Sequence, residues 1–129
     1  MKRYQNTVTS YNANNVVIRM QYNEGNKRKI VNVKAIDVPG QGHFRQQVQG
    51  RFNEVLGVLV VIDSTTRQTD AQAAEFLYDI LNSNVLVGNR VPTLVVCNKQ
   101  DSSEARSADH LEKELEIQMY WLVLSVGSI

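Results

Sequence analysis

The sequence predicts an α/β fold in which apolar strands alternate with amphipathic helices around a largely parallel sheet. The chain has 129 residues, 43% hydrophobic and 21% charged, which suits one domain with a single core. Two continuous apolar runs, Val55–Ile62 and Thr93–Cys97, are typical of buried strands in parallel sheets. Helical periodicity in the segments around them completes the pattern, with helices expected on both faces of the sheet.

The first elements are predicted to be two strands joined as an antiparallel hairpin. Asn15–Met20 and Ile30–Ile36 are rich in β-branched residues, and a polar stretch separates them. The basic cluster Lys27–Lys29 falls in that stretch, which indicates a solvated hairpin tip rather than a binding patch.

The helices are predicted from apolar spacing. His43–Phe52 carries apolar side chains four residues apart, and Ser107–Ile117 turns its two leucines inward. The clearest helix follows a capping box in which Thr69 precedes Gln72 by three residues. Its core-facing stripe is expected to consist of Ala73, Phe76, Leu77, Ile80 and Leu81.

Three further expectations concern burial and the end of the chain. Val55–Ile62 suits a strand buried on both faces, Tyr120–Val126 is compatible with a last strand, and Trp121 is expected in the core. The apolar runs are far shorter than the ~20 residues that cross a bilayer, so we predict no membrane span in this chain.

Charge and residue counts narrow the function classes. A net charge of +1 gives no argument for direct nucleic-acid binding. Cys97 is the only cysteine, which excludes an internal disulfide and favours a small buried hydrophobe. His43 and His110 are the only histidines and lack metal-ligand neighbours, so no zinc site is expected.

Polar clusters follow three predicted strands. Asp37-Val38-Pro39-Gly40-Gln41, Asp63-Ser64-Thr65 and Asn98-Lys99-Gln100-Asp101 each come directly after an apolar run. Because ligands of such sheets bind beyond the carboxyl ends of the strands, we expect these clusters at one edge. The ordered pair DxxG and NKxD is the pattern of small GTPases, which have a P-loop NTPase-like three-layer sandwich.

The NKxD residues have a chemical reason to recognise guanine. The Asp101 carboxylate can accept from both N1–H and N2–H of guanine, and adenine would leave it unpaired. Lys99 would lay its stem along the base, and Asn98 would tie neighbouring loops. The alternative is that Asp101 with Glu104 is only a helix cap.

The DxxG residues point to the phosphate side. Asp37 would hold Mg²⁺ through water, the Gly40 amide would meet a terminal phosphate, and Gln41 would position the attacking water. Thr9 is the candidate switch threonine for Mg²⁺. The alternatives are that Asp37–Gly40 is only a turn and that Asp63-Ser64 only caps one.

From Tyr4 to Glu116 the chain resembles the beta subunit of the signal recognition particle receptor. The stretches that carry the resemblance are DVPG, RFNEVLGVLVVIDS, AEFLYDIL, VPTLVVCNKQD and EARSADHLEKELE. It implies a GTP-binding, Mg²⁺-dependent subunit at the cytosolic face of the endoplasmic reticulum membrane. In that family the GTP form binds the receptor alpha subunit, and the pair serves the ribosome and the translocon in co-translational targeting.

Three departures from the family are visible. The 129 residues contain no GxxxxGK[ST], so we expect a small-GTPase domain without its first strand, P-loop and first helix. The family usually has His after DxPG, where this chain has Gln41. After Glu116 the similarity fades, and Ser125 is at best a poor substitute for the second base-contacting loop.

The missing phosphate cradle predicts weak or absent GTP binding and marginal stability for this chain alone. Three readings follow. The chain is an incomplete copy of a working GTPase subunit, a nucleotide-free interaction module that docks through Thr9 and Asp37–Arg45, or, more weakly supported, an Arf-like GTPase.

Overall fold

The computed structural model describes residues 14–42 and 45–127. The chain divides into two compact units, one ending at Gly40 and the other beginning at Gln41. The first unit is a β-hairpin, and the second is the α/β part of the chain.

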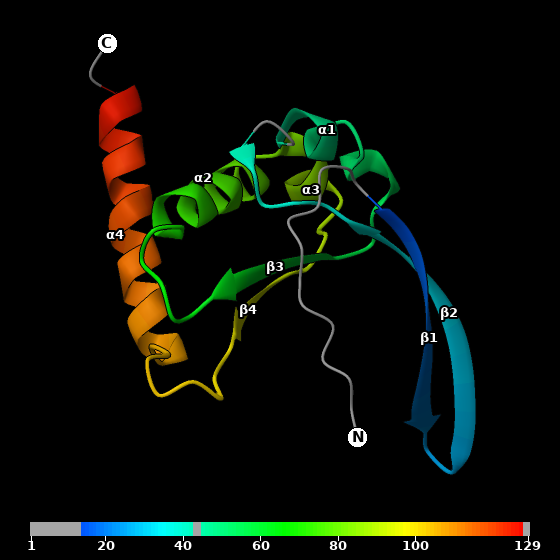
Figure 1. Ribbon diagram of the computed structural model, residues 1–129. Coiled ribbons are helices and arrows are strands. Elements are labelled where there is room, and N and C mark those ends of the chain that lie inside the picture. Colours follow the sequence, from blue (N-terminus) through cyan, green and yellow to red (C-terminus); the bar gives the residue numbers. More distant parts are fainter. Residues whose placement is uncertain (1–13, 43–44, 128–129) are drawn as a thin grey trace. The chain divides into compact units, whose positions relative to one another are not determined.

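The hairpin consists of β1 (Asn14–Glu24) and β2 (Lys27–Asp37), which pair antiparallel along their whole length (Figure 1). A two-residue loop joins them, and Gly25 in it has φ 59°, a left-handed conformation that glycine adopts without steric cost. The predicted hairpin is confirmed, and both strands run further toward the tip than expected. Lys27–Lys29 are exposed, as expected, and Lys29 pairs with Glu24, but they begin β2 next to the loop and do not form the tip itself.

One face of the hairpin is apolar. Residues opposite each other in an antiparallel pair share a face, so Ile18 lies with Val33, and Met20 lies with Val31. All four side chains are roughly 40–50% exposed. A two-stranded hairpin without a covered apolar face is only marginally stable in water, so β1 and β2 are held mainly by their own ladder.

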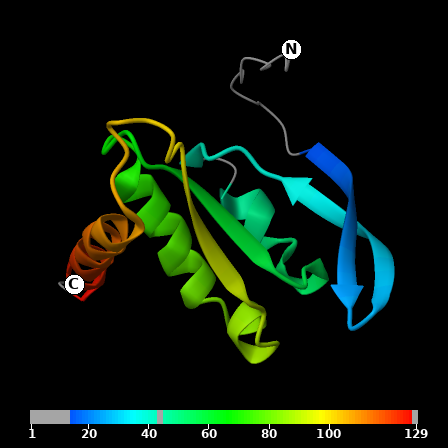
Figure 2. The same cartoon turned by 90° about the horizontal axis from the view of Figure 1, so that it is seen from below.

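The second unit alternates helices and strands. In order it contains α1 (Arg45–Gln49), the 3₁₀ turn η2 (Phe52–Glu54), β3 (Val58–Asp63), α2 (Asp70–Leu81), α3 (Asn84–Gly88), β4 (Thr93–Asn98) and α4 (Ala108–Val126). The strands β3 and β4 are parallel, with Val58 opposite Thr93 and Asp63 opposite Asn98 (Figure 2). The predicted α/β class with a parallel pair and helices is confirmed, but the expectation of helices on both faces is wrong for β3–β4, because the face that carries Leu59 and Leu94 is exposed. The predicted helix His43–Phe52 is shorter in the described residues, as α1 and η2.

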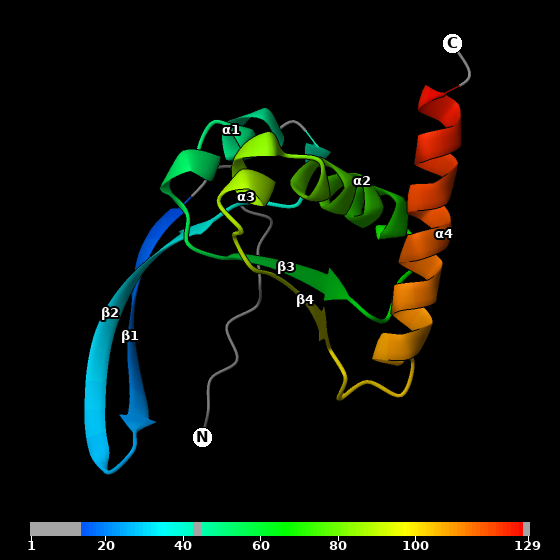
Figure 3. The ribbon, with the colours of Figure 1, turned by 180° about the vertical axis from the view of Figure 1, so that it is seen from behind.

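The core of the second unit lies where α2 meets β3 and α4 (Figure 3). Its main cluster contains five buried side chains from these three elements: Ile62, Ala74, Leu77, Leu111 and Leu115. The partly buried Cys97 packs against this cluster, as expected for a small hydrophobe. A second cluster joins Phe52, Ile80 and Leu86. The inward-facing leucines predicted for the last helix are therefore confirmed.

The prediction that the Val55–Ile62 strand is buried on both faces is wrong. Val58, Val60 and Ile62 face the helices, whereas Leu59 and Val61 point the other way and are exposed. Leu94 on β4 lies opposite Leu59 and is exposed as well. For β3, a continuous apolar sequence therefore does not show how many faces of the strand are covered.

The prediction of a last strand at Tyr120–Val126 is also wrong, because α4 continues through it. Met119 and Leu122 pack on the main cluster, extending the inward positions of Leu111 and Leu115 at helical spacing. Trp121 falls between these positions and is exposed, so its assignment to the core is wrong as well.

The start of α2 differs from the predicted capping box. Thr69 has helical backbone angles, φ −101° and ψ −2°, and the amide of Gln68 is instead satisfied by the Thr66 hydroxyl at 3.2 Å. The first helical residue is Asp70, which is buried. Of the predicted stripe, Leu77 and Ile80 are buried and Ala73 and Phe76 half-buried, whereas Leu81 is exposed.

Candidate functional site

The carboxyl ends of β3 and β4 lie side by side, which confirms the predicted shared edge for these two strands. The amide of Ser64 donates to the carbonyl of Asn98 across that edge at 3.2 Å. Immediately beyond it, Lys99 has φ 61°, a left-handed conformation that is uncommon for a residue with a side chain. The chain turns sharply at Lys99, so the residues that follow leave the sheet as a loop.

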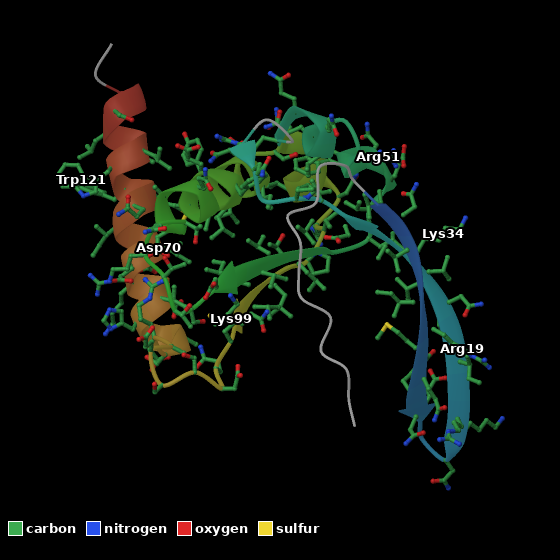
Figure 4. All side chains as sticks on the ribbon, viewed as in Figure 1. Arg19, Lys34, Arg51, Asp70, Lys99 and Trp121 are labelled. Atoms are coloured by element: carbon green, nitrogen blue, oxygen red, sulfur yellow. The ribbon has the colours of Figure 1, made fainter. Side chains whose placement is uncertain are left out.

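An ion pair fixes the side chain of Lys99. Its Nζ lies 2.7 Å from Oδ2 of Asp63, the last residue of β3. Figure 4 shows Lys99 at the end of β4. The other carboxylate oxygen of Asp63 accepts from the amide of Thr65 at 2.9 Å and from its hydroxyl at 2.6 Å. Asp63 therefore caps the turn, as the alternative for Asp63-Ser64 predicts, and also anchors Lys99.

These contacts change the acidity of Asp63. The hydrogen bond from Lys99, followed by those from Thr65, lowers the pKa of Asp63 to about 2, against the opposing effect of burial. The carboxylate is therefore ionised at neutral pH. Because Lys99 is more than half exposed, the pair holds the ammonium in place more than it stabilises the fold.

A second set of contacts joins the loop from Lys99 to Arg106 to Ser64. The side-chain amide of Gln100 donates to the fully buried Ser64 hydroxyl and to the carbonyl of Arg106, both at 2.9 Å. The backbone amide of Arg106 in turn donates to the carbonyl of Ser64 at 3.0 Å. The loop from Lys99 to Arg106 is thus tied at both ends to the residue that follows β3.

The centre of this support is the guanidinium of Arg106, whose side chain is 10% exposed. It contacts both carboxylate oxygens of Asp70, at 2.5 and 3.0 Å, and also Glu114 and the carbonyl of Thr66. The hydrogen bond that Arg106 donates to Asp70 is the largest influence and raises the pKa of Arg106 further, so the group stays charged. The cluster joins the loop to the first turn of α2 and to α4.

Glu114 is the second acid of the Arg106 cluster. Burial alone would raise the pKa of Glu114, but hydrogen bonds from Arg106 and His110 and the charges of Arg67 and Arg106 lower it overall. His110 lies 3.2 Å from the carboxylate and Arg67 lies 3.0 Å from it. The acid therefore stays ionised beside the two arginines.

Sequence reasoning missed this cluster. One signal was available: Asp70 stands four residues before Ala74 and seven before Leu77, so it falls on the buried face of α2. An acid in that position implies a buried cationic partner. Nothing in the sequence, however, identifies Arg106 as that partner, because the pair is 36 residues apart.

The three predicted base-contacting residues are all exposed: Asn98 at the end of β4, and Lys99 and Asp101 on the loop beyond it. The alternative that Asp101 is a helix cap is wrong, because α4 begins at Ala108 and its cap is Ser107, whose hydroxyl accepts from the His110 amide at 3.3 Å. Within the described residues, no hydrogen bond or ion pair engages the Asp101 carboxylate. That carboxylate is therefore available to an external donor.

The predicted phosphate-side residues lie elsewhere in the chain. Asp37 is the exposed last residue of β2, and Gly40 ends the first unit, with open space where a Cβ would stand. Gln41 begins the second unit and is half-buried. Thr9 lies outside the described residues. The structure thus brings Asn98 and Lys99 together with Asp63, and places Asp37 and Gly40 in a separate unit.

Two shallow hollows occur in the second unit, and both lie away from the Asn98–Asp101 loop. One, of about 260 Å³, lies between α2 and α4, and the other, of about 330 Å³, between η2 and the end of α2. Over the described ranges, no group of three or more His, Cys, Asp or Glu side chains could hold a metal ion. None of the helices in those ranges combines the length and hydropathy that a bilayer span requires.

Comparison with known proteins identifies the family. A family model described as signal recognition particle receptor beta subunit matches residues 1–123. The chain belongs to this family. It is 34% identical over 119 residues to signal recognition particle receptor subunit beta of Rattus norvegicus, and 33% identical over 118 residues to that of Homo sapiens. These alignments cover 91% and 90% of this chain but 42% of each relative, so the chain spans about two fifths of their length.

More distant relatives indicate the wider class. ADP-ribosylation factor-like protein 2 of Drosophila melanogaster is 30% identical over 97 residues, which cover 72% of this chain and 52% of that protein. Members of the signal recognition particle receptor beta family and Arf-like proteins thus match overlapping parts of the chain. The α/β arrangement described above agrees with part of a small-GTPase fold of this Arf-like kind.

Proposed function

We propose that this chain carries the guanine-selecting part of a GTP-binding subunit of the signal recognition particle receptor. In this role the subunit acts in co-translational targeting and binds the receptor alpha subunit in its GTP form. One observation supports base recognition above all: the Asp101 carboxylate has no partner among the described residues and lies two residues beyond Lys99, which Asp63 anchors.

Asp101 and Lys99 divide base recognition between them. The two oxygens of Asp101 would accept from the adjacent N1–H and N2–H donors of guanine. Lys99 would place its aliphatic stem along the base, and the ion pair with Asp63 already sets the direction of that stem. Asn98 would join the loop to its neighbours.

The residues present fit the base half of GTP better than the triphosphate half. Fixed backbone amides and a lysine normally hold the β- and γ-phosphates, and the 129 residues contain no GxxxxGK[ST]. We propose that Asp37 and Thr9 would contribute to the Mg²⁺ shell, that Gly40 would meet a terminal phosphate, and that Gln41 would orient water. GTP should therefore bind weakly or not at all to this chain by itself.

The partner and the location follow the family. The proposed partner is the receptor alpha subunit, with the ribosome and translocon reached through it. The proposed location is the cytosolic face of the endoplasmic reticulum membrane. Direct binding of nucleic acid is not part of the proposal, because the net charge of +1 would give little attraction to a phosphate backbone.

The test compares this chain with a longer form that carries a GxxxxGK[ST] segment upstream of it. Titration with fluorescent GTP and ATP analogues should give micromolar or tighter GTP binding only in the longer form. In that form Asp101→Asn should shift preference from guanine to xanthine by about a hundredfold or more, because the amide can donate to the C2 carbonyl. Glu104→Gln, which neutralises another exposed acid of the loop, is the matched control and should leave the preference unchanged.

Two results would count against the proposal. Micromolar GTP binding by the 129-residue chain would show that the phosphates find a cradle elsewhere. Unchanged guanine preference in Asp101→Asn would show that this carboxylate does not read the base.

A nucleotide-free interaction module is the second candidate. The missing GxxxxGK[ST] and the exposed apolar face of the hairpin favour it. In this role the segment Asp37–Arg45, together with Thr9, would dock the alpha subunit. Capture of the alpha subunit by this chain without nucleotide supports the module, and strict dependence on GTP excludes it.

A further inference from the structure

The outer side of α4 carries an apolar stripe that the core does not use. Ile117, Tyr120, Trp121 and Leu124 recur at i, i+3, i+4 and i+7, and their side chains are 42–61% exposed. The inward positions Leu115, Met119 and Leu122 lie on the other side of the helix. Figure 4 shows Trp121 projecting outward from α4. We call these four residues the outer stripe.

The half of α4 that bears the outer stripe is free of charge. From Ile117 to Gly127 the sequence holds no Asp, Glu, Lys or Arg, whereas Asp109–Glu116 contains four acids and one lysine. The boundary between the two halves is abrupt. A helix face meant for water would carry its charges throughout, so the second half is suited to a less polar surrounding.

The two aromatic side chains indicate which kind of less polar surrounding the second half of α4 suits. Tyr120 and Trp121 meet edge to face, with ring centroids 6.1 Å apart and planes at 67°. Each has an apolar body and a polar tip, a combination enriched at the headgroup level of bilayers, and here aliphatic side chains flank them one turn away on each side. A stable protein complex normally buries about 800 Å² on each partner, which is more than four side chains of one helix provide.

From these observations we infer that the outer stripe of α4 is a membrane-surface site that inserts into the headgroup region of a phospholipid bilayer. The helix would lie on the membrane rather than across it, since its first half is acidic and no described helix meets the requirements of a span. The acids Glu112 and Glu116 are exposed and would stay in water. Binding should therefore need no anionic lipid and should resist salt.

The proposed membrane contact is made by the outer stripe of α4 and does not depend on the proposed nucleotide chemistry. Failure of the nucleotide experiments would leave it standing, and its own failure would leave base recognition untouched.

The chain contains a built-in reporter, because Trp121 is its only tryptophan. The full chain is titrated with phosphatidylcholine vesicles, and the emission maximum and vesicle flotation are measured. Trp121 starts 61% exposed, so insertion should shift its emission to the blue, and the chain should float with the vesicles at both low and high salt. Lipids brominated near the headgroup end of the acyl chain should quench Trp121, which tests insertion in the unmutated chain.

Variants locate the contact. Ile117→Asp combined with Leu124→Asp should lower vesicle partitioning by tenfold or more, because each change removes an aliphatic side chain that would insert into the bilayer and adds a charge. The matched control is Leu56→Asp, at a position 93% exposed in the connection before β3, and it should partition like the unmodified chain. Circular dichroism confirms that each variant keeps its helices.

Several outcomes would overturn the inference. One is the absence of any blue shift or quenching with vesicles. Another is equal flotation of the double variant. A blue shift that follows protein concentration without vesicles would instead assign the stripe to a second copy of the chain, and one that appears only with the receptor alpha subunit would assign it to a protein interface.

Discussion

The β1–β2 hairpin and the loop beyond β4 are held in shape in different ways. Each places a polar residue at the end of a strand, Asp37 at the end of β2 and Asn98 at the end of β4. The hairpin is held by its ladder, and its apolar face stays half exposed. The loop is held by Ser64, Gln100 and the guanidinium of Arg106.

The comparison shows which elements keep the loop beyond β4 in a fixed shape. The loop beyond β4 takes its support from β3, α2 and α4, all within one unit. Its geometry therefore does not require the hairpin. The β1–β2 ladder has no comparable support among the described residues of its own unit, so the end of β2 at Asp37 should be the less well fixed of the two.

Of the substitutions that test this comparison, removal of the Arg106 guanidinium should cause the largest loss of stability. Arg106→Met would leave the buried carboxylate of Asp70 with its charge uncompensated, which costs about 3–5 kcal/mol, and would remove one of the partners of Glu114. For a chain expected to be marginally stable, the second unit should lose its fold. Urea denaturation followed by circular dichroism would measure the loss.

The control for Arg106 is another arginine that pairs with the same acid. Arg67 lies 3.0 Å from Glu114 but its side chain is 71% exposed, so Arg67→Met should cost about 1 kcal/mol or less. Equal effects of the two substitutions would mean that the Arg106 cluster does not organise the loop.

A matched pair of isoleucines would sharpen the contrast between the two sheets. Ile62 at the end of β3 is 3% exposed and Ile18 in β1 is 47% exposed. Ile62→Ala should cost roughly 3 kcal/mol through lost burial and a cavity, whereas Ile18→Ala should cost about 1 kcal/mol. Hydrogen exchange of the β3–β4 and β1–β2 amides would assign each loss to its own sheet. A larger loss for Ile18 would show that the hairpin face is buried in solution.

Much of the fold could be predicted because its local signals agree with each other. The hairpin, β3, α2 and β4 all follow from residue type and periodicity, and so does the shared edge at Asp63 and Asn98. The wrong secondary-structure prediction arose where a strand-like and a helix-like apolar pattern compete. Tyr120–Val126 is apolar enough for a strand, but the inward spacing from Leu111 to Leu122 is helical, and packing on α2 decides for the helix.

The candidate site was less predictable because its support is long-range. The NKxD residues could be found from a motif, and Asp63 from its place at a strand end. The partner of Lys99 and the role of Arg106 depend on contacts between residues 36 apart, which no local pattern encodes. A motif thus identifies candidate site residues, and only the structure shows what holds them.

The smallest expected effect concerns the pH dependence of the loop. The pKa of Asp63 is about 2 in the folded chain and 3.8 ordinarily, so its folded-state value is depressed. The stability it contributes is then fully present above pH 4 and is lost as the pH falls through about 2. The difference corresponds to at most about 2 kcal/mol, and to less here because Lys99 is more than half exposed. Lys99→Met should return the pKa of Asp63 toward 3.8 while the bonds from Thr65 remain, and a carboxyl NMR titration of both chains would detect it. An unchanged titration in Lys99→Met would mean that the ion pair does not form in solution, and that the direction of the Lys99 stem is not set before a base binds.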